Sequence, residues 1–326
     1  MGRHRFRSSR ACRGGCGGCA AVAPRQHEHA HGRGAGRRPS KAKAPFTYPT
    51  GDFSGTFGKF KAGDLTVTGT SQVTTAYQVA TITAPGKGQQ YEGNDGKTYF
   101  APHVVGHVIT YAKGAFKPAG TGFHAGEKQK PIKPGFPAGY SDSTYTWEYA
   151  DGAWGQVVVD GGKYTEKDLA AVAKGLTGTD ETPIKVGFKL GQLPDGYRLV
   201  SAGQSTNYLE PTFEGQSYVQ VVKGDVPTTG LTGTFGDSYD NGSKQLPNLQ
   251  FQVFPAWQQK YMHAGNEPYC GSEGICYAYT KDKKFFIEAI GGGFVPDSEL
   301  LTILKSVEFA DPTDTATWFP AEKAIG

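Results

Sequence analysis

One segment of the chain occurs twice, and this duplication limits the folds that the sequence can adopt. Tyr149–Leu176 and Thr280–Val307 align without a gap at an offset of 131 residues, which matches Trp154 with Phe285. Each copy has the pattern of two strands around a tight turn, followed by a glycine-rich break and a short helix. The sequence therefore predicts a repeated strand–strand–helix unit.

The helix of each copy is amphipathic. The first is expected to begin near Thr165, a good N-cap residue, with Asp168 at the capping-box position. The second is expected to follow Pro296. The apolar positions that share one face are Leu169, Val172, Ala173 and Leu176 in the first helix and Leu300, Ile303, Leu304 and Val307 in the second. We expect both faces to pack against a sheet.

More strand-like runs, separated by turn residues, precede each copy. The turn "GNDGKT" at Gly93–Thr98 is one example. We therefore predict an α+β fold of two tandem domains, residues 46–192 and 193–326, each an antiparallel curved sheet with one short helix packed on a face.

The basic residues are concentrated at the N-terminus. Residues 1–45 hold eleven of the 34 Lys and Arg residues and one of the 30 acids, which leaves 23 basic and 29 acidic residues in the rest of the chain. We predict that 1–45 is a disordered basic tail rich in Gly, Arg and Ala. The remainder has no basic stripe, so no nucleic-acid partner is predicted.

Three cysteines of this tail have a suggestive spacing. Cys12, Cys16 and Cys19 form a C-x3-C-x2-C pattern, which resembles the cluster motif of radical S-adenosylmethionine enzymes. The flanks have neither strand nor helix periodicity, and Gly18 stands where that family usually has an aromatic residue. We interpret the spacing as accidental and assign no cofactor and no metal.

The tail also lacks the apolar core of a secretory signal, since Ala20–Ala23 is its longest apolar run. Read one base later, its Cys, Arg and Gly codons are compatible with an apolar span of about 20 residues, the length of a bilayer crossing. We therefore keep open a membrane tether through an N-terminal segment that is not visible in this reading frame.

Cys270 and Cys276 are the cysteines outside the tail. They flank a short turn in "PYCGSEGICYAY", where they can face each other at the base of a hairpin. We predict that they form a disulfide, which implies an oxidising compartment. The alternatives are two reduced buried thiols or half of a metal site, for which His263 is the nearest further ligand in sequence.

One segment resembles an enzyme motif. "TFGDSYDNG", Thr234–Gly242, is similar to the nucleophile block of GDSL-type esterases, with Ser238 as the implied nucleophile. That family also has an Asp-x-x-His near its C-terminus, and this chain has none. A turn between strands explains the same residues, so we assign no catalytic residue.

The histidines of the first half, His103, His107 and His124, are scattered. His103 and His107 are four residues apart in a Val-rich segment typical of a strand, without a third ligand nearby in sequence. We expect them to be ordinary surface or core residues.

The repeated hairpin, the strand start "LPDGY" at Leu193–Tyr197 and the late "YC…C" hairpin look like those of uncharacterised membrane-anchored extracytoplasmic proteins of actinobacteria. The resemblance implies an architecture and an extracytoplasmic location, secreted or anchored, and no activity. We therefore expect a non-catalytic binding or sensing module with an unknown ligand. A lipid or lipoprotein carrier and a Ser238 esterase are the alternatives. Candidate groove residues are Tyr218, Phe251, Phe254 and Trp257.

Overall fold

The computed structural model describes residues 47–49, 53–118, 138–141, 143–159, 163–204, 212–231, 240–241, 244–259, 265–271 and 274–326. The chain divides into the units Met1–Pro39 and Ser40–Gly326, and the description below concerns the second unit alone. The predicted disordered tail, 1–45, and its three cysteines lie outside the described residues.

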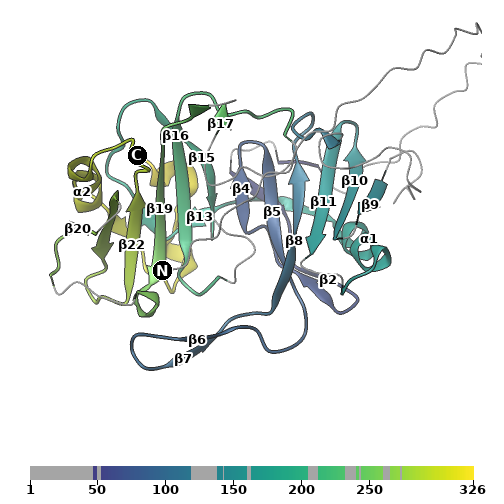
Figure 1. Cartoon of the computed structure of the whole chain (residues 1–326), viewed down its shortest axis with the longest axis horizontal. Coiled ribbons are helices and arrows are strands. Elements are labelled where there is room, and N and C mark those ends of the chain that lie inside the picture. The colour runs from purple at the N-terminus through teal and green to yellow at the C-terminus, as the bar shows by residue number, and fades with distance from the viewer. Residues whose placement is uncertain are drawn as a thin grey trace, which may run out of the picture. The chain divides into compact units, whose positions relative to one another are not determined.

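Strands make up most of the regular structure (Figure 1). In the first half these are β1 (Ser54–Phe57), β2 (Phe60–Ala62), β3 (Leu65–Val67), β4 (Gln72–Thr74), β5 (Tyr77–Thr83), β6 (Gln90–Glu92), β7 (Thr98–Phe100), β8 (Val104–Tyr111), β9 (Ala138–Ser141), β10 (Thr144–Ala150), β11 (Ala153–Val159), β12 (Gly178–Pro183), β13 (Lys185–Val186) and β14 (Phe188–Lys189). In the second half they are β15 (Tyr197–Gly203), β16 (Ser217–Lys223), β17 (Asp240–Asn241), β18 (Lys244–Gln245), β19 (Asn248–Pro255), β20 (Tyr269–Cys270), β21 (Ile275–Tyr279), β22 (Phe285–Ile290), β23 (Glu308–Phe309) and β24 (Phe319–Pro320).

Over the described residues, the helices are few and short. They are α1 (Glu166–Gly175), α2 (Asp297–Lys305) and α3 (Ala321–Ala324), with 3₁₀ turns at Ala256–Gln258 and Thr315–Thr317.

The prediction of an α+β fold with two separate sheets is wrong. The protein is mostly β, and strands of both halves form one 14-stranded antiparallel sheet. The halves are joined by β4, a strand of three residues, which is too short for an alternating pattern to reveal its pairing with β15.

The strand order of this sheet reads the same from both ends. It runs β20-β21-β22-β19-β16-β15 in the second half and continues β4-β5-β8-β11-β10-β9 in the first, with β2 and β3 attached beside β5. In each half the connection between the second and third strands counted from the centre contains a small hairpin, β6–β7 in the first half and β17–β18 in the second. The duplication detected in the sequence thus corresponds to two similar half-sheets joined at their equivalent strands β4 and β15.

The two longer helices cover the same face of the sheet. α1 begins after Thr165, as predicted, and the N–H of Thr165 donates to the Asp168 carboxylate at 2.9 Å. α1 packs on β10 and β11, and α2 on β20, β21 and β22. The buried helix residues are Leu169, Val172 and Ala173 in α1 and Leu300, Ile303 and Leu304 in α2. Each helix forms a hydrophobic core with its own half of the sheet.

The gapless sequence alignment does not hold through the strands of the repeat. Phe285 lies in the helix-side core with Ile287, whereas Trp154 lies on the opposite face and packs against Phe116. The turns differ in length: Ala150 pairs with Ala153 across a two-residue turn, but a longer turn separates β21 from β22. A shift of one residue moves a side chain to the other face, so the aligned pair Trp154 and Phe285 is wrong in three dimensions.

The segment that connects the two half-sheets is held by the C-terminus. β13 pairs with β24 and β14 pairs with β23, and the N–H of Leu190 donates to the carbonyl oxygen of Ala324 at 2.7 Å. The predicted domain boundary at residues 192 and 193 falls in the loop that follows, before β15, and it stays a prediction.

The junction between β4 and β15 is narrow. It consists of the pairs Ser201↔Thr74, Ala202↔Val73 and Gly203↔Gln72. Gly203 permits the close approach, because a Cβ atom there would lie 2.4 Å from the carbonyl oxygen of Ser71 and 2.8 Å from the Cα of Gln72. Backbone atoms of this kind cannot move aside without changing the pairing.

We predict that Gly203→Ala lowers the free energy of unfolding by about 1–3 kcal/mol, the usual cost of overpacking a filled site. The measurement is urea denaturation followed by circular dichroism. Gly69→Ala is the matched control, because the nearest atom to a Cβ there is 3.7 Å away. Equal effects of the two substitutions would show that the junction does not limit stability.

Candidate ligand-binding site

The β6–β7 hairpin belongs to the first half of the chain and contacts the second half. We call residues Gln90–Phe100 the arm. Figure 1 shows the arm leaving the first half between β5 and β8 and running beneath the strands of the second half. Its tip meets the chain directly after β19.

Asn94 at the tip anchors the arm by three hydrogen bonds. Its backbone N–H donates to the carbonyl oxygen of Trp257 at 3.0 Å, and its side-chain amide donates to the carbonyl oxygens of Ala256 at 3.0 Å and Gln259 at 2.6 Å. Each bond is worth about 1 kcal/mol net. Asn94 therefore holds the tip against one specific turn of the second half.

Aromatic rings form the second attachment. Tyr99 of the arm stacks on Trp257, with ring centroids 3.8 Å apart and planes 5° from parallel. Tyr91, directly opposite Tyr99 in the hairpin, meets Phe213 edge to face at 5.3 Å, and Phe213 meets Trp257 at 4.8 Å. Pairs of this kind add about 0.5–1.5 kcal/mol each beyond the area that they bury.

The arm needs glycine at its first turn position. A Cβ atom on Gly93 would lie 2.7 Å from the Tyr99 ring and 3.2 Å from the Cβ of Trp257. The "GNDGKT" segment was predicted to be a turn, and this prediction is confirmed. No pattern in the sequence indicated that the turn contacts Trp257.

A cavity of about 630 Å³ lies where the arm meets the second half. We call it the clasp pocket. It is open to solvent, and its volume falls in the usual range for small-molecule sites. Its lining residues are Asn94, Asp95, Lys97 and Tyr99 from the arm and Phe213, Glu214, Pro255, Ala256, Trp257, Lys283, Lys284, Phe285 and Thr313 from the second half.

An adjoining groove of about 910 Å³ shares Lys284, Phe285 and Thr313 with the clasp pocket. It lies between the β21–β22 turn and the segment after α2, and both acids and lysines line it. The clasp pocket is the stronger candidate because it has the larger share of aromatic lining and is formed by both halves of the chain.

The four predicted groove residues do not come together in one groove. Tyr218 and Phe251 are fully buried on opposite faces of the sheet. The Tyr218 hydroxyl contacts the Ser201 hydroxyl at 2.5 Å, while Phe251 belongs to the helix-side core. Phe254 is partly buried against Phe286. Of the four, Trp257 lines the clasp pocket.

Tyr99, Phe213 and Lys283 line the same pocket and were missed. Tyr99 and Phe213 lie in different halves of the sequence, and no local pattern places them together. Lys283 carried no signal in the sequence, because its unusual feature is a backbone angle that the structure alone shows. It occupies a turn position with φ of 55°, a backbone conformation in which Gly or Asn is the usual residue.

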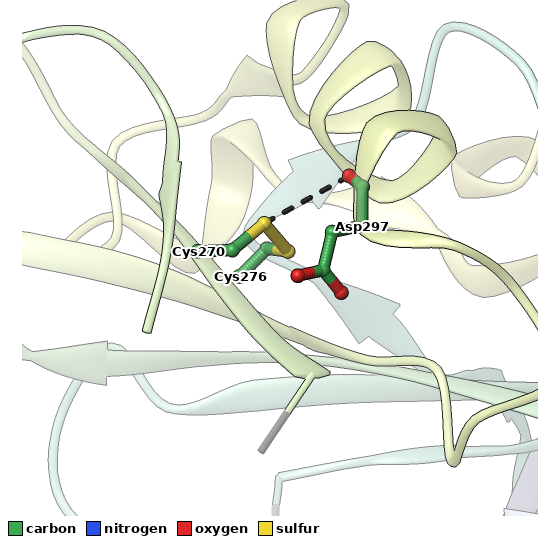
Figure 2. A group of neighbouring side chains, drawn as sticks. All are labelled: Cys270, Cys276 and Asp297. Atoms are coloured by element: carbon green, nitrogen blue, oxygen red, sulfur yellow. Dashed lines mark hydrogen bonds between the residues drawn. A yellow bond between two sulfur atoms is a disulfide. The ribbon is translucent and has the colours of Figure 1, made fainter. Parts of the chain in front are cut away.

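Cys270 and Cys276 form a disulfide, the predicted pairing. The two residues pair directly across β20 and β21, so the bond fixes the edge strand of the sheet. Figure 2 shows the disulfide beside the N-terminus of α2, with the Cys270 sulfur 3.8 Å from the Asp297 carbonyl oxygen. In the part of the chain that the structure describes, these cysteines and Asp297 are the one group with metal-ligand spacing. Both sulfurs are engaged in the disulfide, so neither is available as a thiolate.

The described histidines do not come together. His103 is half-buried, and its Nδ1 lies 3.4 Å from the carbonyl oxygen of Pro85. His107 is buried in β8, and burial lowers its pKa to about 4, so the ring is neutral at physiological pH. His124, His263 and the candidate nucleophile Ser238 lie outside the described residues.

Comparisons with known proteins identify no family. No protein-family model matches the chain, and a search of curated proteins gives no significant match. Among solved structures, the complex of MucA and MucB from Pseudomonas aeruginosa is similar over 79% of this chain and 93% of that chain, at 11% identity and a TM-score of 0.22. A likeness at that level supports no conclusion about fold or function. Over the described ranges, none of the helices has the length and apolar character needed to span a membrane.

We predict that Asn94→Ala raises the rate of tryptic cleavage after Lys97 about tenfold or more in the native protein. The substitution removes two side-chain hydrogen bonds that hold the arm, each worth about 1 kcal/mol, and cleavage follows the population of the open arm. Gln90→Ala, a change at an exposed position of the same hairpin, is the control. An unchanged rate in Asn94→Ala would mean that these bonds do not hold the arm.

Proposed function

We propose that the protein is a non-catalytic extracytoplasmic binding or sensing module whose ligand occupies the clasp pocket. The observation that carries the proposal is the composition of the pocket wall. Four aromatic and five charged side chains line a cavity of about 630 Å³. Predominantly apolar cavities of this size with a few polar groups are the usual form of a small-molecule site.

The position of the pocket suits a sensor. One wall belongs to the arm, which comes from the first half, and the other wall belongs to the second half. A ligand that contacts both walls stabilises the arm in its docked position by mass action. Binding can therefore change how firmly the arm is held, without any change in the sheet.

The extracytoplasmic location is supported by the Cys270–Cys276 disulfide, because structural disulfides persist in oxidising compartments. The resemblance to membrane-anchored actinobacterial proteins agrees with this location. Whether the protein is secreted or anchored through an N-terminal tether belongs to the proposal.

The two rival functions make different demands. A lipid or lipoprotein carrier needs a large continuous apolar cavity, whereas the clasp pocket is open and carries lysine and acidic side chains. An esterase would need Ser238 beside a general base. His107 is buried within β8, and burial lowers its pKa to about 4, which makes its imidazole a weak base.

Ligand-observed NMR with a library of small-molecule fragments tests the proposal. We expect a set of fragments that bind the parent protein and lose binding in Trp257→Ala. Trp154→Ala is the matched control, since Trp154 is also a partly buried tryptophan packed on an aromatic ring, and it should keep the same set. Fragments that bind both variants equally well would place binding elsewhere and defeat the proposal.

Hydrolysis of p-nitrophenyl acetate separates the binding module from the esterase. We expect the parent and Ser238→Ala to hydrolyse the ester at the same background rate. Activity above background that disappears in Ser238→Ala would establish the esterase and refute the non-catalytic reading.

A further inference from the structure

Positive charge is in excess among the groups that line the clasp pocket, with three lysines and two acids. On the arm, the Asp95 carboxylate accepts hydrogen bonds from the Lys97 N–H at 3.1 Å and the Tyr99 hydroxyl at 2.9 Å, and it lies 3.3 Å from the Lys97 ammonium. The charges of Asp95 and Lys97 therefore offset each other within the arm tip. Lys283 and Lys284, opposed by Glu214, remain on the other wall.

Lys284 is held loosely enough to accept a ligand. Lys284 lies 3.2 Å from Asp282, but both side chains are well exposed, at 75% and 53%. An exposed ion pair of this kind contributes little stability, because water solvates both partners. Lys284 lines the clasp pocket and Asp282 does not, so the Lys284 side chain must turn away from Asp282 to meet an anion in the pocket. Leaving this exposed ion pair costs little.

Lys283 has an unusual backbone conformation. Its φ is 55°, in the left-handed region, where residues other than Gly, Asn and Asp are strained. The conformation is fixed by the turn, in which the Lys283 N–H donates to the Thr280 carbonyl oxygen at 2.9 Å. The lysine side chain lines the clasp pocket, with its ammonium 3.2 Å from the Gly265 carbonyl oxygen.

Resting on the proposed function, we infer that the ligand class of the clasp pocket is a small aromatic anion. Its ring lies against the aromatic wall of Phe213, Trp257 and Phe285, and its acid group lies toward the ammonium groups of Lys283 and Lys284. The aromatic wall recognises a flat apolar group, and the adjacent lysines favour an acid over a neutral group.

The test compares two fluorescent probes that differ in one group. 1-Anilinonaphthalene-8-sulfonate carries a sulfonate, and N-phenyl-1-naphthylamine is the same ring system without it. We expect the parent protein to bind the sulfonate about tenfold or more tightly than the neutral probe. Trp257→Ala should lose both probes, with its fold checked by near-ultraviolet circular dichroism.

Variants that remove one positive charge show which lysine causes the preference for the sulfonate probe. Lys283→Asn keeps a residue that tolerates the left-handed conformation, so the fold should be retained while affinity for the sulfonate falls about five- to tenfold and affinity for the neutral probe stays unchanged. Lys281→Asn is the matched control: it lies in the same turn, lines the adjoining groove rather than the clasp pocket, and should alter neither probe.

The remaining outcomes are separable. Equal binding of the two probes, with both lost in Trp257→Ala, would overturn the anion class and leave the binding module intact. Failure of both probes to bind, or binding that survives Trp257→Ala, would overturn the anion class and count against the proposed function as well. Displacement of both probes by oleate, at a lower concentration than by naphthalene-1-sulfonate, would overturn the aromatic anion in favour of the lipid carrier.

Discussion

The antiparallel pairing of β4 with β15 is the interaction on which the rest of the architecture depends. Three residue pairs join two half-sheets whose facing edges would otherwise expose unpaired backbone groups. Side chains reinforce the pairing on the face opposite the helices, where Gln72 donates to the Ser201 hydroxyl at 3.2 Å. Because equivalent strands of a duplicated unit pair with each other, the strand order becomes palindromic and both helices fall on one face.

The same arrangement explains why each half reaches across to the other. The connection between β5 and β8 contains the arm, which docks on the chain after β19. The corresponding connection between β16 and β19 contains Leu231, whose backbone hydrogen-bonds to Ala115 and Lys117 in the loop after β8. In the first half this crossing is packed with buried side chains, including the stacked rings of Tyr111 and Phe116. In the second half, the place where the arm crosses contains an open cavity, the clasp pocket. One of two similar crossings thus serves packing, and the other is available to a ligand.

Local features of this protein could be predicted from its sequence, and long-range ones could not. The start of α1 at Thr165, the buried helix faces and the Cys270–Cys276 disulfide follow from capping, periodicity and a short turn. The continuous sheet depends on β4, a strand of three residues. Its partner β15 lies far away in sequence: Gln72 of β4 and Ser201 of β15 are 129 residues apart. A pairing of this kind leaves no local pattern. For the same reason Trp257 could be named as a groove residue, but its partners Tyr99 and Phe213 could not.

Hydrogen–deuterium exchange, with and without bound 1-anilinonaphthalene-8-sulfonate, tests most directly the claim that a ligand in the clasp pocket joins the arm to the second half. The account predicts slower exchange on binding at the arm tip, residues 93–99, and also at residues 256–259 and 283–285, with the central strands unchanged. Protection confined to one of the two walls, or located away from all three segments, would contradict it.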